Sequence, residues 1–155
     1  MYDRDKALAY AMRWALLRNP NYYDFSNLGG DCTNFCSQCL YTGAGVMNYT
    51  PNIGWFYNSL NNRAPAWTGV EEFYNFLTSN EGKGPFGGQS TLSSIEVGDF
   101  IQLGNNRGFY HCLFVSGFRG NIPLVCSHSY DRLNAPLTDY YYERVRFIKI
   151  LGVRQ

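Results

Sequence analysis

Residues 29–38 read Gly-Gly-Asp-Cys-Thr-Asn-Phe-Cys-Ser-Gln, and this stretch predicts the start of a helix. The two glycines close a loop, Asp31 is a residue type that favours the N-cap position, and a helical run through Tyr41 follows. Cys32 then stands at the first helical position, where unpaired backbone N–H groups and the helix dipole favour an anion. Because a helix N-terminus is one of the environments that lower the pKa of a thiol, we expect Cys32 to be a nucleophile.

The other four cysteines are expected to be structural. Cys36 and Cys39 follow Cys32 on the same helical face and have the character of small buried hydrophobes. Cys112 and Cys126 fall in predicted strands. The total of five is odd, and the placement differs from that of a disulfide scaffold, so we expect five free thiols.

The composition indicates a single globular domain over residues 1–155, with 45% hydrophobic and 16% charged residues. The net charge of +1 gives no support to nucleic-acid binding. Aromatic residues reach 17%, which favours a groove lined by rings. We find neither a run of apolar residues long enough for a transmembrane segment nor a signal peptide, so a cytoplasmic protein and a domain excised from a longer secreted protein both fit.

Helical patterns come first and strand patterns second, which predicts an α+β fold with N-terminal helices packed on a C-terminal antiparallel sheet. Residues 46–69 are expected to form a long aromatic loop, either a binding loop or a packed irregular segment, with a helical turn near residues 55–60. Residues 81–89 are expected to be a glycine-rich connection. The predicted helices cover residues 3–17, 32–41 and 69–77, and the predicted strands cover 99–103, 111–118, 122–128 and 145–153.

A thiolate nucleophile needs a base, and histidine suits because its pKa lies near neutrality. The chain has two histidines, His111 and His128, each in a predicted strand beside the turn at residues 119–121. A two-residue hairpin loop would place both rings on one face of the ribbon, within side-chain reach. A three-residue loop would break this arrangement unless a bulge restored the register.

Four short motifs resemble the putative amidase domain family of bacteria, which is related to NlpC-type cell-wall endopeptidases and CHAP amidases. Those enzymes are papain-like thiol hydrolases in which a helix bearing Cys packs on an antiparallel sheet bearing His. The motifs are Gly-Gly-Asp-Cys-Thr-Asn-Phe at 29–35 with Ser37-Gln38, Val-Gly-Asp-Phe-Ile at 97–101, Tyr110-His111, and His-Ser-Tyr-Asp at 128–131.

The resemblance implies a thiol amidase or peptidase with Cys32 as nucleophile, His111 as base and His128 as the residue that orients the base. Asp131 is the alternative orienting residue. A tyrosine near the oxyanion site is matched by Tyr22 or Tyr23. The implied substrate is a peptide or amide, with a peptidoglycan stem peptide as the specific expectation, and no cofactor or metal is expected.

Three alternatives stay open at this point. The spacing Cys32-x3-Cys36-x2-Cys39 matches a radical iron–sulfur motif, but a helix from Asp31 would spread these thiols over two turns. A zinc site of His111, His128 and a Cys lacks the close paired spacing of common zinc sites. The same fold with an inactive site would be a binding module that recognises wall peptides through its aromatic loop.

Overall fold

The computed structural model describes all residues from Met1 to Gln155. The chain forms four α-helices, two short 3-10 helices and eight strands. None of the helices has the length and apolarity needed to cross a bilayer. The elements in chain order are α1 (Arg4–Trp14), η1 (Phe25–Asn27), α2 (Cys32–Ala44), β1 (Tyr57–Ser59), β2 (Asn62–Arg63), α3 (Pro65–Thr68), α4 (Val70–Ser79), β3 (Gly84–Ser90), β4 (Phe100–Asn105), β5 (Gly108–Arg119), β6 (Ile122–Ser127), β7 (Arg132–Pro136), η2 (Leu137–Asp139) and β8 (Arg144–Arg154).

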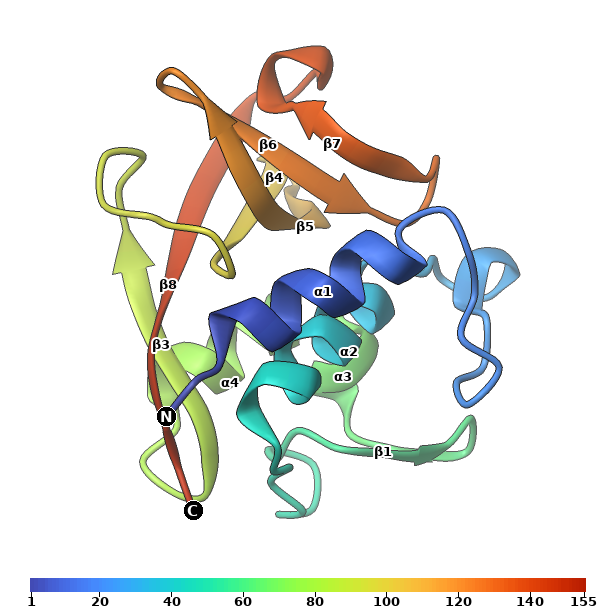
Figure 1. The fold of residues 1–155 in the computed structure, drawn as a ribbon. Coiled ribbons are helices and arrows are strands. Elements are labelled where there is room, and N and C mark those ends of the chain that lie inside the picture. The colour runs from blue at the N-terminus through green and yellow to red at the C-terminus, as the bar shows by residue number, and fades with distance from the viewer.

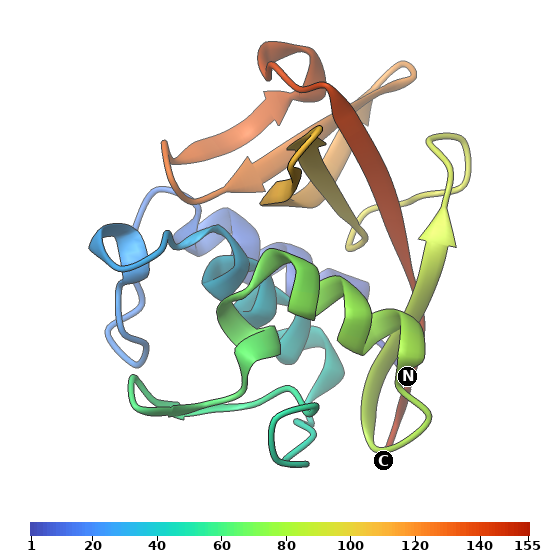
Figure 2. The same cartoon turned by 180° about the vertical axis from the view of Figure 1, so that it is seen from behind.

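The fold is α+β, as the sequence predicts. Six strands form one sheet in the order β3-β8-β4-β5-β6-β7, and every neighbouring pair is antiparallel. The helices gather on one side of this sheet, and the two termini lie near each other (Figures 1 and 2). A separate two-stranded hairpin, β1–β2, lies beyond the helices.

Alternating side chains of the sheet enter two different hydrophobic clusters. On β5, Cys112 and Phe114 pack with the helices, whereas Leu113 and Val115 pack on the opposite face. On the second face, the strand residues pack with Ile95, Leu137, Tyr140 and Tyr142. Because successive strand residues point to opposite faces, this pattern assigns every β5 side chain to one side of the sheet.

The helix predictions are confirmed with shifted ends. Asp3 caps α1 by accepting from the backbone N–H of Lys6, and the helix ends at Trp14 rather than at residue 17. Helix α2 begins at Cys32 and continues past Tyr41 to Gly45, whose left-handed φ of +77° terminates it.

The central strands are confirmed, but two predictions about the remaining segments are wrong and one strand was missed. Residues 81–89 are not a loose connection, because β3 pairs along β8 as an edge strand. Residues 55–60 form part of a hairpin instead of a helical turn. Strand β7 was not predicted, because its sequence Arg-Leu-Asn-Ala-Pro lacks the alternating apolar pattern of a strand.

The β5–β6 hairpin has the two-residue loop Gly120–Asn121. A bulge between Val115 and Gly117 then shifts the pairing by one residue, so that Phe114 faces Cys126. A bulge inserts one extra residue in one strand and therefore exchanges the faces of every side chain beyond it.

The bulge separates the two histidines. Continuing the register from Phe114 sets His128 across from Cys112, whereas an unbulged ribbon with this loop would set it across from Leu113, on the same face as His111. The ring of His111 packs against Tyr140, which belongs to the cluster on the far face, and His128 packs against the helices. The prediction that the two imidazoles share one face is therefore wrong, because the register argument assumed an unbulged ribbon.

Candidate functional site

Cys32 begins α2 as the sequence predicts, but Asp31 does not act as the expected cap. No side chain caps this helix. The carboxylate of Asp31 turns back instead and accepts from the backbone N–H of Phe25 at 2.8 Å and from the Asn34 side-chain amide at 2.9 Å. Because no capping oxygen occupies the first turn, its backbone N–H groups stay available to another acceptor.

The thiol of Cys32 is covered, with 7% of the residue exposed. Burial, together with the neighbouring thiol of Cys112, raises the pKa of Cys32 to about 11. The backbone N–H groups of Cys112 and Thr33 and the Thr33 hydroxyl favour the thiolate, but burial outweighs them. In this structure the thiol therefore has the opposite pKa shift from the one that its helix position alone predicts.

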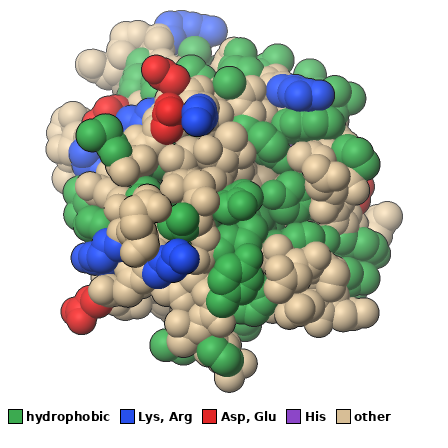
Figure 3. Space-filling model, turned by 60° about the horizontal axis from the view of Figure 1, so that its bottom comes forward, with side chains coloured by type: hydrophobic (Ala, Val, Ile, Leu, Met, Phe, Trp, Pro, Cys, Tyr) green, Lys and Arg blue, Asp and Glu red, His purple; other side chains and the backbone are tan.

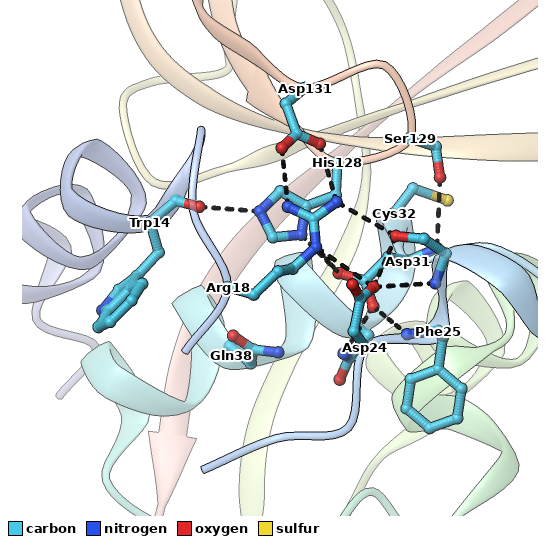
Figure 4. A network of polar contacts seen from close by, with 12 residues as sticks. Trp14, Arg18, Asp24, Phe25, Asp31, Cys32, Gln38, His128, Ser129 and Asp131 are labelled. Atoms are coloured by element: carbon cyan, nitrogen blue, oxygen red, sulfur yellow. Dashed lines mark hydrogen bonds and ion pairs between the residues drawn. The ribbon is translucent and has the colours of Figure 1, made fainter. Parts of the chain in front are cut away.

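His128 is tied to the start of α2 at both ring nitrogens. Its Nδ1 lies 2.5 Å from Oδ2 of Asp31, and its Nε2 lies 2.8 Å from the carbonyl oxygen of Trp14 (Figure 4). The ring also stacks on Phe35 at a centroid distance of 4.2 Å. A carboxylate and a carbonyl both offer acceptor oxygens, so both ring nitrogens of His128 are occupied. His128 makes no hydrogen bond with His111.

Arg18 joins the segments that meet at the helix start (Figure 4). Its guanidinium donates to both carboxylate oxygens of Asp131, at 2.8 and 3.0 Å. Its Nε is buried and lies 3.2 Å from Oδ1 of Asp24 and 3.6 Å from Oδ2 of Asp31. Asp131, the alternative orienting residue, is therefore paired with Arg18 and not with a histidine.

His111 lies on the other face of β5 from Cys112. Its ring makes no hydrogen bond and packs against Tyr140 at a centroid distance of 5.9 Å. Burial lowers the pKa of His111 to about 4, so the imidazole is neutral near neutral pH. The one side-chain hydrogen-bond partner of the Cys32 sulfur is the Thr33 hydroxyl, at 3.8 Å, so neither histidine bonds to the thiol in this structure.

The two candidate tyrosines have different surroundings. Tyr22 packs among Tyr57 and Trp67, and burial raises its pKa to about 12. The backbone carbonyl of Tyr23 accepts from the Asn34 side chain at 3.0 Å, which attaches Tyr23 to the first turn of α2. Of the two, Tyr23 is thus connected directly to the start of the Cys32 helix.

The other thiols lie where the sequence predicts. All five cysteines are free and buried. No group of three or more His, Cys, Asp or Glu side chains is placed to hold a metal ion.

Sequence reasoning missed Arg18 and the carbonyl of Trp14. The aspartates at 24, 31 and 131 lie on three separate segments, and nothing in their spacing indicates that one arginine joins them. A backbone carbonyl carries no sequence signal at all. Both partners become visible only when α1 is placed beside the end of β6.

Two cavities of about 600 and 590 Å³ are lined by residues 91–95 with 118–121 and by residues of α1 with 19–21, and neither is lined by Cys32, His111 or His128. On the face shown in Figure 3, hydrophobic side chains gather toward the centre and right, Lys and Arg lie mainly toward the left and top, and no histidine is visible.

Comparison with known proteins places the chain in a family. The family model described as "Putative amidase domain" matches residues 1–150. A protein of Bacillus subtilis (strain 168), "Uncharacterized protein YhbB", is 31% identical over 135 residues, which cover 84% of this chain and 42% of the relative's length. No solved structure matches the chain. The extent of the family match means that this chain belongs to the putative amidase domain family.

Proposed function

We propose that the chain is a cysteine-dependent amide hydrolase, with residues 1–155 acting as one domain. The family membership supports hydrolysis of amides. The observation that carries the thiol mechanism is the uncapped start of α2, where the turned carboxylate of Asp31 leaves the first N–H groups beside the Cys32 sulfur. Such N–H groups suit the oxyanion of a tetrahedral intermediate, a stabilisation of about 3 kcal/mol per donor in other enzymes.

In the proposed reaction, Cys32 attacks the amide carbonyl and forms an acyl-enzyme, and water then releases the acyl group. His111 is the proposed base. Its ring nitrogens carry no hydrogen bond, and its neutral form can take the thiol proton and return it to the leaving amine. Its backbone continues directly into Cys112, whose N–H faces the Cys32 thiol. The step requires a rearrangement of β5 around His111, because the ring now packs against Tyr140 on the face of the sheet opposite Cys32.

The proposed role of His128 is structural, in place of the expected role of orienting the base His111. Because both its nitrogens are bonded to Asp31 and Trp14, it holds Asp31 away from the cap position and keeps the N–H groups of α2 free. The family resemblance and the helix-on-sheet arrangement support a papain-like relationship with NlpC-type and CHAP enzymes, and peptidoglycan stem peptides are the proposed substrates.

A binding module is the second candidate, favoured by the position of the His111 ring on the far face of the sheet. It predicts that stem peptides bind without being cleaved. Equilibrium dialysis of stem peptides against the wild-type chain, followed by chromatography of the recovered peptide, separates binding from cleavage.

The test of the thiol mechanism is the hydrolysis of soluble stem peptides by Cys32→Ala, measured as newly released amine. The matched control is Cys39→Ala, which removes a buried thiol from the same helix. We expect no detectable release with Cys32→Ala and wild-type release with Cys39→Ala once both are shown to be folded. Wild-type release by Cys32→Ala would reject the nucleophile.

A further inference from the structure

A cavity of about 590 Å³ lies between α1 and residues 19–21, away from the thiol. Its volume is in the range of small-molecule sites, and Cys32 is not among the residues that line it. Two cations of α1, Lys6 and Arg13, line this cavity, and no Asp or Glu does. The cavity is therefore a candidate site for a small molecule that carries a negative charge.

Three polar side chains on the wall of this cavity have no partner within the protein. Lys6 and Asn21 bond to other side chains only through their backbone N–H groups. Arg13 makes no ion pair, and its guanidinium carbon lies over the ring of Trp14, 4.8 Å from the centroid. A guanidinium held over a ring keeps the N–H groups at its edge free, and that edge matches the two oxygens of a carboxylate. These groups are thus available to a ligand.

Hydrogen bonds hold the aromatic part of the wall in place. The Tyr10 hydroxyl donates to Oε1 of Gln38 at 2.5 Å and accepts from the side-chain amide of Asn19 at 3.0 Å. Oδ1 of Asn19 in turn accepts from the backbone N–H of Asn21 at 2.9 Å. The rings of Tyr10 and Trp14 line the cavity with their centroids 6.3 Å apart. A ligand therefore meets a wall that is already formed, which lowers the entropy cost of binding.

We propose that this cavity binds a sugar that carries a carboxylate. The C–H face of a sugar ring packs on aromatic rings, and its hydroxyl groups bond to an amide such as that of Asn21. Arg13 supplies a two-point contact for the carboxylate, and Lys6, about 10 Å away along the helix axis, adds positive charge. The inference does not depend on the proposed hydrolase activity, because the thiol lies outside this cavity.

The test is a titration of the tryptophan fluorescence of the intact chain. Trp55 and Trp67 are fully buried, so Trp14 is the tryptophan that a ligand in this cavity reaches. The probes are glucuronate beside glucose, and N-acetylmuramate beside N-acetylglucosamine. In each pair only the first sugar carries a carboxylate. Acetate serves as a carboxylate without a sugar ring.

We expect a saturable fluorescence change with at least one acidic sugar in the millimolar range, and about tenfold weaker binding of its neutral counterpart and of acetate. Arg13→Gln should weaken binding of the acidic sugar about tenfold, because it removes a charge-assisted two-point contact. Lys6→Gln should weaken it about threefold, since a single exposed cation contributes less. The controls Lys83→Gln and Arg107→Gln, which remove exposed cations outside the cavity, should match wild type.

The site is rejected if neither acidic sugar binds more tightly than its neutral counterpart, or if acetate binds as tightly as the acidic sugar. A fluorescence change that persists in Trp14→Phe would place the ligand elsewhere and also reject it. Equal weakening in Arg13→Gln and Arg107→Gln would report net charge instead of a site. The titration involves no hydrolysis, and Cys32→Ala should bind the sugar as wild type does. Failure of the titration therefore leaves the proposed hydrolase standing, and failure of the hydrolase leaves the sugar site standing.

Discussion

The two histidines of this chain occupy opposite faces of one sheet, and their surroundings differ in kind. His128, on the helix side, has partners at both ring nitrogens, stacks on Phe35 and is 1% exposed. His111, on the other side, has no hydrogen bond and contacts Tyr140. A fully bonded imidazole contributes to stability and cannot exchange protons without breaking those bonds, whereas an unbonded one is free to do so. The same residue type thus has a structural and a chemical candidate role within one hairpin.

The largest expected effect is the loss of hydrolysis when His111, the proposed base, is replaced. His111→Gln should lower hydrolysis of stem peptides at least about 10³-fold, because removal of the general base disables the nucleophile. The fold should persist, since no hydrogen bond is lost. Released amine, measured beside a circular dichroism spectrum, checks both statements. Undiminished release of amine by His111→Gln would show that His111 is not the base.

The next effect tests His128 as a structural residue. His128→Ala removes the imidazole from Oδ2 of the buried Asp31 and leaves that carboxylate its bonds to Phe25 and Asn34, and breaking such a buried contact costs about 3 kcal/mol of unfolding free energy. For a chain of this length the melting temperature should fall by about 6–12 °C. Thermal unfolding at neutral pH provides the measurement, with His111→Ala as the matched loss of an imidazole. An equal drop in both variants would contradict the contrast between the two faces.

A smaller effect concerns pH. Because burial lowers the pKa of His111 from 6.5 to about 4, the unfolded chain takes up a proton first as the pH falls. The native state therefore loses stability between pH 6.5 and about 4, by about 3 kcal/mol from this group. Urea unfolding across that window should show a flatter pH dependence for His111→Gln than for wild type. Identical curves would mean that the imidazole is not buried.

The smallest effect separates the two contacts of Tyr140. Its hydroxyl lies 2.8 Å from the Ser127 hydroxyl, and its ring faces His111. Tyr140→Phe keeps the ring and should cost about 1 kcal/mol for the lost hydrogen bond, with hydrolysis unchanged. Ser127→Ala removes the same bond from the other side and serves as the control. A strong loss of hydrolysis in Tyr140→Phe alone would assign the hydroxyl a part in the reaction.

The sequence predicted the elements that depend on local signals. Helical spacing predicted α1 and α2, and strand patterns predicted the central strands β4, β5 and β8. It did not predict β3, because the glycines of residues 84–90 resemble a loop and only pairing with β8 makes this segment a strand. The predictions succeeded where the residues that determine an element are close together in the sequence. They failed at β3, where the determining contact is with the distant strand β8.

The candidate site shows the same difference between features that local sequence predicts and features that distant contacts decide. The sequence by itself determined that Cys32 begins a helix, that His128 lies at a strand end, and that the chain resembles an amidase family, whereas His111 lies inside β5 and not at its end. Only the tertiary structure decided that a bulge after Val115 moves His111 and His128 to different faces, that Asp31 binds His128 instead of capping α2, and that Arg18 joins Asp131 to the helix start. The physical reason is that helix starts and strand periodicity depend on neighbouring residues, whereas register and ion-pair partners depend on which distant segments pack together.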